Sequence, residues 1–353
     1  MPTEDDIKNA LKAVKYPGFS RDIVSFGLIK EISSANGAVT VSMELTGSAE
    51  AAQQIKAESE HALKSLPGVT AALVQIKQKA GAATGGQNKN QIPGIKRIVA
   101  VASGKGGVGK STCSVNLACA LTYLGYRVGL LDCDIYGPSI PLMMGVHEKP
   151  TISPEEKLVP PSNYGVKLMS MGFLLEDDQP VIWRGPMIQK TIQQFVMAVD
   201  WGELDFLLVD LPPGTGDAQL SLVQATHVAG ALIVTTPQEV AVGDALRGAK
   251  MFERVGVPVI GVVENMSGFT DPETGRRFEL FSSGGGQRLA EEISVPLLGS
   301  VPLQPQLAVL ADEGQPILIA QPESPAAQSL RDIAEQLQRK TAGRSMALPI
   351  MRG

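Results

Sequence analysis

The apolar and polar positions of the first 78 residues follow two different periods. At the start of the chain apolar side chains recur at helical spacing, whereas in Val39-Thr-Val-Ser-Met-Glu-Leu45 every second residue is apolar, as in a strand with one solvent-exposed face. A second helical stretch and a second strand-like stretch follow. The pattern predicts a small α+β domain whose elements lie, in order, at 5–14, 39–45, 50–66 and 70–76.

From residue 95 onward, short apolar runs alternate with helical stretches. Runs such as Phe206-Leu-Leu-Val-Asp210 are apolar almost throughout rather than alternating, which is typical of parallel strands covered by helices on both faces. Parallel strands need crossover connections, and these are right-handed. The sequence therefore predicts a doubly wound, mostly parallel α/β domain with strands at 97–102, 128–132, 206–210, 231–235, 259–263 and 297–301.

A stretch of different composition separates the two predicted domains. Residues 79–94 are rich in Gly, Ala and Asn, and Ile92 is their single large apolar side chain. Such a composition is typical of a flexible linker. We therefore expect an α+β domain over 1–78, a linker over 79–94, an α/β domain over 95–340 and a short tail over 341–353 that frays.

Composition and charge narrow the class of protein. The 353 residues include 31 basic and 36 acidic side chains, a net charge of −5, and 44% of the residues are hydrophobic. This excludes wholesale disorder and argues against a nucleic-acid partner, which would call for a basic surplus. No apolar run reaches about 18 residues, so we expect no membrane span. The acidic start has no apolar core, which points to a cytoplasmic protein.

The most informative motif is Gly104-Lys-Gly-Gly-Val-Gly-Lys-Ser-Thr112, which fits G-x-x-x-x-G-K-[ST]. A predicted strand precedes it and a helical stretch follows, which favours a phosphate-binding loop over a mere Gly-rich turn. The glycines let backbone amides turn toward phosphate oxygens, and the helix N-terminus adds partial positive charge. We expect Lys110 to reach the β- and γ-phosphates of ATP, Ser111 to ligate Mg²⁺ and Thr112 to bond the α-phosphate. The expected nucleotide-binding residues of the loop are Gly104, Lys105, Gly106, Gly107, Val108, Gly109, Lys110, Ser111 and Thr112.

Lys105 is a second lysine inside this loop. The loop resembles the deviant Walker A loop of the MinD/ParA-type ATPases, in which two subunits enclose two nucleotides and the extra lysine crosses the interface. The resemblance implies a homodimer in which Lys105 reaches the phosphates bound by the other subunit and takes part in catalysis with Lys110. The alternative is a solvated surface lysine.

Aspartates stand at the ends of two predicted strands. Asp132 and Asp134 close one run and Asp210 closes another, so all three are expected at the carboxyl edge of the sheet, where ligands bind. Asp210 is expected to orient the water shell of Mg²⁺. Resemblance to the same ATPase class implies that Asp134 directs the attacking water and that Asp132 supports the magnesium shell. The alternative for each is a helix cap or a turn former.

Two further positions complete the expected site. Gly214 lies in Pro212-Pro-Gly-Thr-Gly-Asp217, which we expect to be a switch loop whose Gly214 amide donates to the γ-phosphate. Asn265 closes another predicted strand, and resemblance to the ATPase class implies that it binds the adenine edge. A turn residue at a strand end is the alternative for Asn265.

Several further segments occur in order along the chain: 131–139 (LDCDIYGPS), 183–186 (WRGP), 200–203 (DWGE), 210–217 (DLPPGTGD), 234–238 (VTTPQ) and 264–267 (ENMS). Together they resemble the Mrp/ApbC family of iron–sulfur cluster carrier ATPases over about residues 94–338. The resemblance implies a homodimer whose partners are iron–sulfur client or scaffold proteins. Residues 22–29 (DIVSFGLI) resemble the small domain that often precedes this ATPase and occurs alone in iron–sulfur assembly factors; the alternative is an unrelated α+β module.

The chain departs from this family in its cysteines. Family members usually carry a C-P-x-C-G pair after the Asn-Met-Ser segment, and two subunits together supply four thiolates to one cluster. Here Asp271 and Thr274 occupy the cysteine positions, and their hard oxygens suit a soft iron–sulfur cluster poorly. The three cysteines present form no CxxC pair, so no four-thiolate site within one chain is expected. We expect small buried hydrophobes at all three: Cys113, Cys119 and Cys133.

Three functions stay open at this point. The first is a dimer that binds and slowly hydrolyses ATP and serves iron–sulfur cluster carriage or delivery. The second is a nucleotide-switched adaptor that holds no cluster itself, which the missing cysteine pair favours. The third, a spatial-positioning ATPase of the MinD/ParA kind, is disfavoured because the tail over 341–353 has no periodic apolar face and the net charge is −5.

Overall fold

The chain divides into two compact units, Met1–Asn88 and Lys89–Gly353, each with its own hydrophobic core. Most of the predicted linker and tail, and the segment 183–186, lie outside the residues that the structure describes. The computed structural model describes residues 2–14, 22–24, 28–35, 37–45, 49–78, 92–134, 137–174, 197–214, 216, 219 and 226–342.

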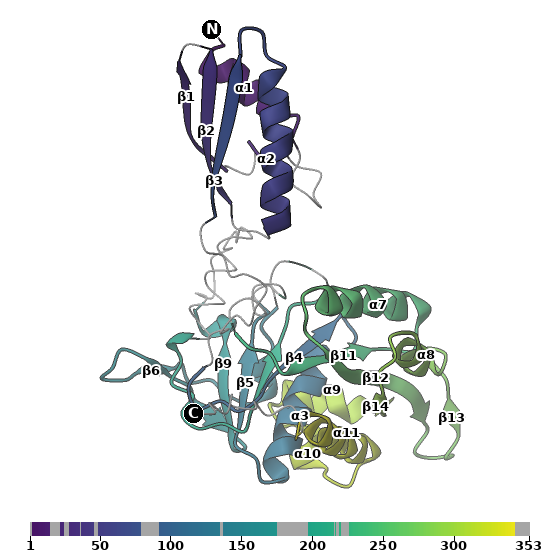
Figure 1. Ribbon diagram of the computed structural model, residues 1–353. Coiled ribbons are helices and arrows are strands. Elements are labelled where there is room, and N and C mark those ends of the chain that lie inside the picture. The colour runs from purple at the N-terminus through teal and green to yellow at the C-terminus, as the bar shows by residue number, and fades with distance from the viewer. Residues whose placement is uncertain are drawn as a thin grey trace, which may run out of the picture. The chain divides into compact units, whose positions relative to one another are not determined.

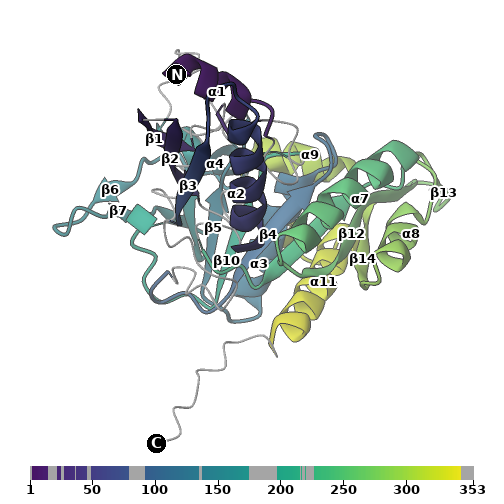
Figure 2. The same ribbon diagram turned by 45° about the horizontal axis from the view of Figure 1, so that its top comes forward.

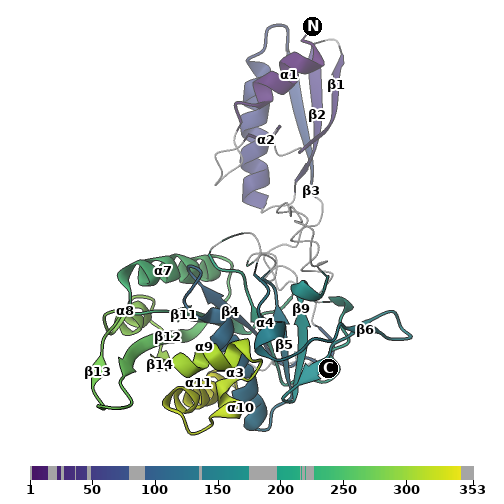
Figure 3. The ribbon, with the colours of Figure 1, turned by 180° about the vertical axis from the view of Figure 1, so that it is seen from behind.

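The N-terminal unit is a three-stranded sheet with two helices packed on one face (Figure 3). β1 pairs antiparallel with β2, and β2 pairs parallel with β3, with Val41 beside Val74. The helix α2 connects the two parallel strands. Alternate residues of β2, namely Val39, Val41 and Met43, are buried against both helices. The helices contribute Ile7 and Leu11 from α1 and Ile55 and Leu63 from α2. The elements are α1 (Glu4–Leu11), β1 (Ile29–Ala35), β2 (Ala38–Leu45), α2 (Ala49–Lys64) and β3 (Ala71–Gln78).

The C-terminal unit is built on a nine-stranded, mostly parallel sheet in the order β13-β12-β11-β4-β10-β5-β9-β8, with β14 beside β12. The long strands pair in parallel, and the antiparallel pairings involve the short strands β8 and β13. This confirms the predicted α/β class. The strands are β4 (Ile98–Ser103), β5 (Val128–Asp132), β8 (Ser162–Asn163), β9 (Val166–Ser170), β10 (Phe206–Asp210), β11 (Gly230–Thr235), β12 (Val259–Thr270), β13 (Arg277–Phe278) and β14 (Leu297–Leu303), and β6 (Thr151–Ile152) pairs separately with β7 (Leu158–Val159).

Helices cover both faces of this sheet (Figures 1 and 2). α7 and α8 pack into the core on one face, and α3 and α11 into the core on the other. Most of the surface of α3 is buried because it lies between the sheet, α10 and α11. The helices are α3 (Lys110–Tyr123), α4 (Ile140–Met143), α7 (Glu239–Arg254), α8 (Gly285–Glu292), α9 (Pro305–Asp312), α10 (Ile317–Ala320) and α11 (Pro325–Ala342), with a 3₁₀ turn η1 (Met171–Leu174).

The sequence prediction misses the two-residue strands β6, β7, β8 and β13 and two longer ones, β1 and β9. β1 reads Ile-Lys-Glu-Ile-Ser-Ser-Ala and lies at a sheet edge, where backbone pairing holds a mostly polar segment in place. β9 is short and carries a lysine, yet it pairs with β5 along its full length. β12 also runs on to Thr270, beyond the predicted end at residue 263.

The carboxyl edge of the sheet gathers the motifs found in the sequence. β4, β5 and β10 are buried along their whole length, and Asp210 lies beside Asp132 in the parallel register of β10 and β5. The glycine loop leaves β4 at the same edge. Within the described part of the chain, no helix is both long and apolar enough to cross a bilayer.

Candidate functional site

The glycine loop links β4 to α3, and its backbone needs glycine at specific positions. Gly107 and Gly109 have positive φ values of 81° and 78°, which glycine adopts without steric cost. Gly109 is also the N-cap of α3, and no side chain caps that helix. A Cβ at Gly109 would overlap the side-chain amide of Asn265, and one at Gly104 would overlap the backbone of Asp244 in α7. The loop therefore presents the first turn of α3, with its unpaired N–H groups, as a site for an anion.

A cavity of about 200 Å³ opens in front of this loop. The loop forms one wall, and Asp134, Ser139, Met143 and Pro213 close the others. Three larger cavities lie elsewhere in the described part of the chain: one of about 580 Å³ at the ends of α7 and α8, one of about 460 Å³ along α11 and one of about 430 Å³ beside β12 and β14. The smaller cavity differs from these because a glycine loop and a helix N-terminus line it together with Lys105, Lys110 and the single carboxylate of Asp134, so its chemistry suits a phosphate group.

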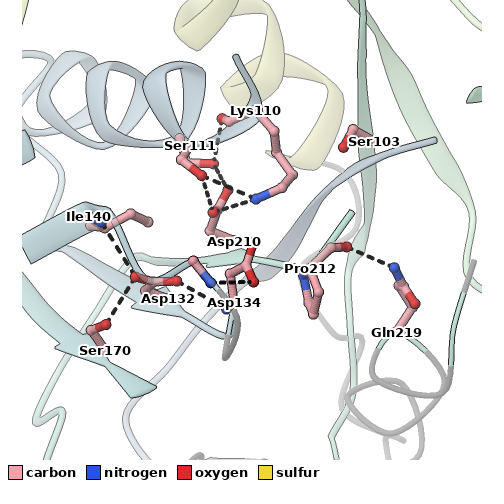
Figure 4. A network of polar contacts seen from close by, with 12 residues as sticks. Ser103, Lys110, Ser111, Asp132, Asp134, Ile140, Ser170, Asp210, Pro212 and Gln219 are labelled. Carbon is pink, nitrogen blue, oxygen red and sulfur yellow. Dashed lines mark hydrogen bonds and ion pairs between the residues drawn. The ribbon is translucent and has the colours of Figure 1, made fainter. Parts of the chain in front are cut away.

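Lys110 and two serines converge on Asp210 (Figure 4). The Lys110 ammonium lies 2.5 Å from Oδ2 of Asp210, and the Ser111 hydroxyl donates to the same oxygen at 2.7 Å. Ser114, one turn along α3, donates to Oδ1 at 2.5 Å. Hydroxyl and carboxylate oxygens are the hard ligands that Mg²⁺ prefers, so the oxygens of Ser111 and Asp210 fit the magnesium site expected from the sequence.

Asp132 and Asp134 differ in their surroundings. The Asp132 carboxylate is 1% exposed and accepts hydrogen bonds from the Asp134 amide at 3.0 Å, the Ser170 hydroxyl at 2.9 Å and the Ile140 amide at 3.4 Å. Burial, with Asp210 nearby, raises the pKa of the Asp132 carboxyl to about 7. Asp134 lines the cavity, whereas Asp132 does not. The structure thus places Asp132 behind the cavity wall, where it holds the segment that carries Asp134.

The loop after β10 is tied to the glycine loop through Ser103. The Gly214 amide donates to the Ser103 carbonyl oxygen at 3.0 Å, and the Ser103 hydroxyl donates to the Lys105 carbonyl oxygen at 3.0 Å. The Gly214 N–H is therefore directed at Ser103 rather than into the cavity. Asp217 lies outside the described residues.

Asn265 lies behind the loop and not in the lining of the cavity. Its side-chain amide donates to the Val108 carbonyl oxygen at 2.9 Å, so it supports the loop from β12. The neighbouring Glu264, which the sequence does not single out, accepts from the Ser267 hydroxyl at 2.8 Å and from the Gly286 amide at 2.6 Å. A buried carboxylate of the chain itself thus occupies the N-terminus of α8.

Lys105 lines the cavity and is partly exposed. Within the described residues its ammonium has no carboxylate partner, in contrast to the buried pair formed by Lys110. A cation held at the rim without a local partner is free to contact a phosphate or a second subunit.

The segment where family members carry cysteines forms a closed turn between β12 and β13. Oδ1 of Asp271 accepts from the amides of Glu273 at 2.8 Å and Thr274 at 3.3 Å, and these hydrogen bonds lower the pKa of the Asp271 carboxyl. The Thr274 hydroxyl accepts from the Arg276 amide at 3.4 Å. Both side chains stabilise the turn itself.

All three cysteines are buried, as the sequence predicts. Burial raises the pKa of the Cys113 and Cys119 thiols to about 12 and that of Cys133 well above its usual value. The part of the chain that the structure describes contains no cluster of three or more His, Cys, Asp or Glu side chains that could hold a metal ion. The donor set therefore does not fit a thiolate-bound iron–sulfur cluster within one chain.

Comparison with known proteins agrees with this architecture. The family model for the NUBPL iron-transfer P-loop NTPases matches residues 94–338, and a model for iron–sulfur cluster assembly proteins matches residues 4–74. An iron–sulfur cluster carrier protein from Synechocystis is 46% identical over 348 residues, covering 97% of this chain and 99% of the relative. The iron–sulfur cluster transfer protein NUBPL from Dictyostelium discoideum is 48% identical and covers 70% of this chain and 78% of the relative.

Solved structures show the same fold. A nucleotide-binding protein from Archaeoglobus fulgidus, in complex with ADP, is 39% identical, covers 67% of this chain and 92% of its own, and superimposes with a TM-score of 0.58. The cell division ATPase MinD from Pyrococcus furiosus covers 69% of this chain and 99% of its own, with a TM-score of 0.53 at 23% identity. The second likeness concerns the fold alone.

Proposed function

The chain belongs to the Mrp/NUBPL family of iron–sulfur cluster carrier P-loop NTPases, and we propose that it binds Mg²⁺–ATP at the glycine loop and hydrolyses it slowly as a homodimer. The observation that carries the proposal is the convergence of Lys110 and Ser111 on Asp210 at the N-terminus of α3. The ADP complex of the Archaeoglobus relative supports an adenine nucleotide as the ligand.

The chemistry asked of these residues is positioning and charge neutralisation. The loop amides and Lys110 bind the phosphate oxygens, and Thr112 adds a hydroxyl. The oxygens of Ser111 and Asp210 would hold Mg²⁺, which when bound neutralises phosphate charge. Asp134, which lines the cavity, orients the attacking water and accepts its proton. Lys105 of a second subunit would supply further positive charge.

The cargo of this ATPase is inferred from its family. Relatives that match along 97% of this chain are iron–sulfur cluster carrier proteins, and the N-terminal unit matches a model for iron–sulfur cluster assembly proteins. We therefore propose that the dimer serves delivery of iron–sulfur clusters to apoproteins, with client or scaffold proteins as its partners.

A second candidate is an adaptor that holds no cluster itself. Two observations favour it: Asp271 and Thr274 close a turn with their side chains, and all three thiols are buried. ATP would then control the shape of the dimer and its contacts with clients, while another protein holds the cluster.

Anaerobic reconstitution with iron and sulfide separates the two candidates. Iron content and visible absorbance are measured for the wild-type protein and for the double variant Asp271→Cys/Thr274→Cys, which places a thiol pair on the turn. The adaptor predicts no stoichiometric cluster on the wild-type protein and a gain in the double variant. A stoichiometric cluster on the wild-type dimer would support the carrier, and an ATP titration in parallel tests the nucleotide site.

A further inference from the structure

Gln219 is a buried side chain that binds the loop after β10 without lining the cavity. It is 1% exposed, and its Nε2 donates to two carbonyl oxygens, those of Pro212 at 2.8 Å and Gly214 at 2.7 Å. Figure 4 shows its amide directed at the Pro212 carbonyl. Only the nitrogen of a carboxamide can donate to two carbonyls, so these contacts fix its orientation.

As a result, the loop after β10 is fixed by hydrogen bonds to both the N–H and the C=O of Gly214. The N–H of Gly214 donates to the Ser103 carbonyl, and its C=O accepts from Gln219. Pro213, whose ring restricts φ, lies between the two carbonyls that Gln219 binds, and it forms part of the cavity wall. The position of that wall therefore depends on Gln219.

The other end of the Gln219 amide is left without a partner. Its Oε1 is buried and accepts no hydrogen bond within the described residues. A buried unpaired acceptor costs free energy, and an apolar side chain of the same length would avoid that cost. The geometry therefore indicates that the amide serves to donate two hydrogen bonds to the loop rather than to fill space.

We propose that Gln219 is a positioning residue that holds Pro212–Gly214 as the wall of the cavity facing the γ-phosphate. This inference rests on the proposed ATPase function. Pro213 lines the cavity together with Asp134, the residue proposed to direct water at the γ-phosphate, whereas Thr112 is expected to bond the α-phosphate. Loss of Gln219 should therefore impair steps that need the γ-phosphate and leave ADP binding intact.

The test uses two substitutions of similar length in the full chain. Gln219→Met removes both donors and fills the same space, and Gln219→Glu keeps the shape but replaces the donors with a carboxylate facing two carbonyls. The matched control is Gln336→Met in α11, which also removes an amide that donates to a backbone carbonyl, that of Leu298 at 2.6 Å. For each protein one measures kcat and KM for ATP, the affinity for ADP, thermal unfolding and the hydrogen exchange of the Gly214 amide.

We expect kcat to fall about ten- to hundredfold in both Gln219 variants, because the loop loses its fixed position, with ADP affinity within about twofold of wild type. The Gly214 amide should exchange faster, while Gln336→Met matches the wild type in kcat and in Gly214 exchange. A Gln219→Met protein with wild-type kcat and wild-type Gly214 exchange would overturn the inference. A wild-type protein that neither binds nor hydrolyses ATP would overturn the proposed function instead, and the exchange of Gly214 would still report on the loop.

Discussion

Lys110 and Asp210 form a buried ion pair that joins the start of α3 to the end of β10. The Lys110 Nζ lies 2.5 Å from Oδ2 of Asp210, and the two side chains are 6% and 0% exposed. Removing one partner of such a pair leaves an uncompensated buried charge, which typically costs about 3–5 kcal/mol. The pair therefore contributes to folding as well as to the proposed phosphate site.

Lys110→Ala should abolish ATP binding and lower the free energy of unfolding by about 3–5 kcal/mol. The double variant Lys110→Met/Asp210→Asn removes both charges, so it should recover most of the stability without recovering binding. Calorimetric titration with ATP and urea denaturation measure the two effects. Unchanged ATP affinity in Lys110→Ala would contradict the assignment of the loop.

Asp134→Ala should bind ATP with wild-type affinity and lose about 10²–10⁴-fold in hydrolysis, the usual contribution of a general base. Asp134→Asn is the matched variant, because an amide oxygen can keep the hydrogen bond from the Gly137 amide without accepting a proton from water. Phosphate release under saturating ATP is the measurement. A normal rate in both variants would remove Asp134 from the mechanism.

Lys105→Ala should weaken ATP-dependent dimerisation and leave the fold intact, since within the described residues its ammonium takes part in no ion pair. Sedimentation at matched protein concentration, with and without ATP, measures the dimer fraction. Lys149→Ala, at an exposed position, is the control. Equal dimer fractions for the Lys105 variant and the control would show that Lys105 is a surface lysine.

The three cysteines should resist alkylation at pH 7 in the folded protein and react after unfolding in urea. Burial, and a pKa raised to about 12 for Cys113 and Cys119, leaves almost no accessible thiolate. Mass spectrometry after iodoacetamide treatment counts the modified thiols. Rapid labelling of any one cysteine under native conditions would show that a thiol is available for a cluster.

Asp205→Asn should lower the free energy of unfolding by about 1 kcal/mol at most, because the side chains that pair with it are half exposed. Hydrogen bonds from Arg127, with a further one from Lys96, hold the pKa of the Asp205 carboxyl well below its usual range. The stabilisation is therefore complete above the unfolded pKa of about 3.9 and is lost as pH falls further.

The difference between wild type and Asp205→Asn should accordingly stay constant from pH 7 to 5 and shrink below about pH 4. Urea denaturation at a series of pH values measures it, with Asp200→Asn at an exposed position as the control. A difference that grows on acidification would contradict the direction of the shift.

The sequence predicts the buried strands well because their pattern is local. β5 and β10 have the predicted bounds, and the glycine loop lies between a strand and a helix as expected. The prediction misses β1 because its residues are mostly polar, although it pairs with β2 across a short turn, from Ala35 beside Ala38. It misses β9 because pairing with β5, much earlier in the chain, holds that strand in place. The pairing of β9 with β5 is a long-range property that no short window of sequence contains.

The same distinction between local pattern and contacts between distant segments applies to the candidate site. The motif identifies Lys110 and Ser111, and the structure brings both to Asp210. The motif does not reveal that the Asp132 carboxylate accepts hydrogen bonds from Ser170 and Ile140. Nor does it reveal that Gln219 donates to the Gly214 carbonyl. These contacts depend on where β9 and the loop after β10 return to the carboxyl edge of the sheet.

The strand β12 connects two regions that the proposed function treats separately. It runs from Val259 to Thr270. Within it the side chain of Asn265 donates a hydrogen bond to the Val108 carbonyl of the glycine loop, and the turn that begins at Asp271 follows directly after its end. Thermodynamic linkage then makes the effect reciprocal. If a client binds that turn with higher affinity when ATP is bound, the client must raise the affinity of the protein for ATP by the same factor. A client titration followed through nucleotide affinity would thus report on docking without any label on the client.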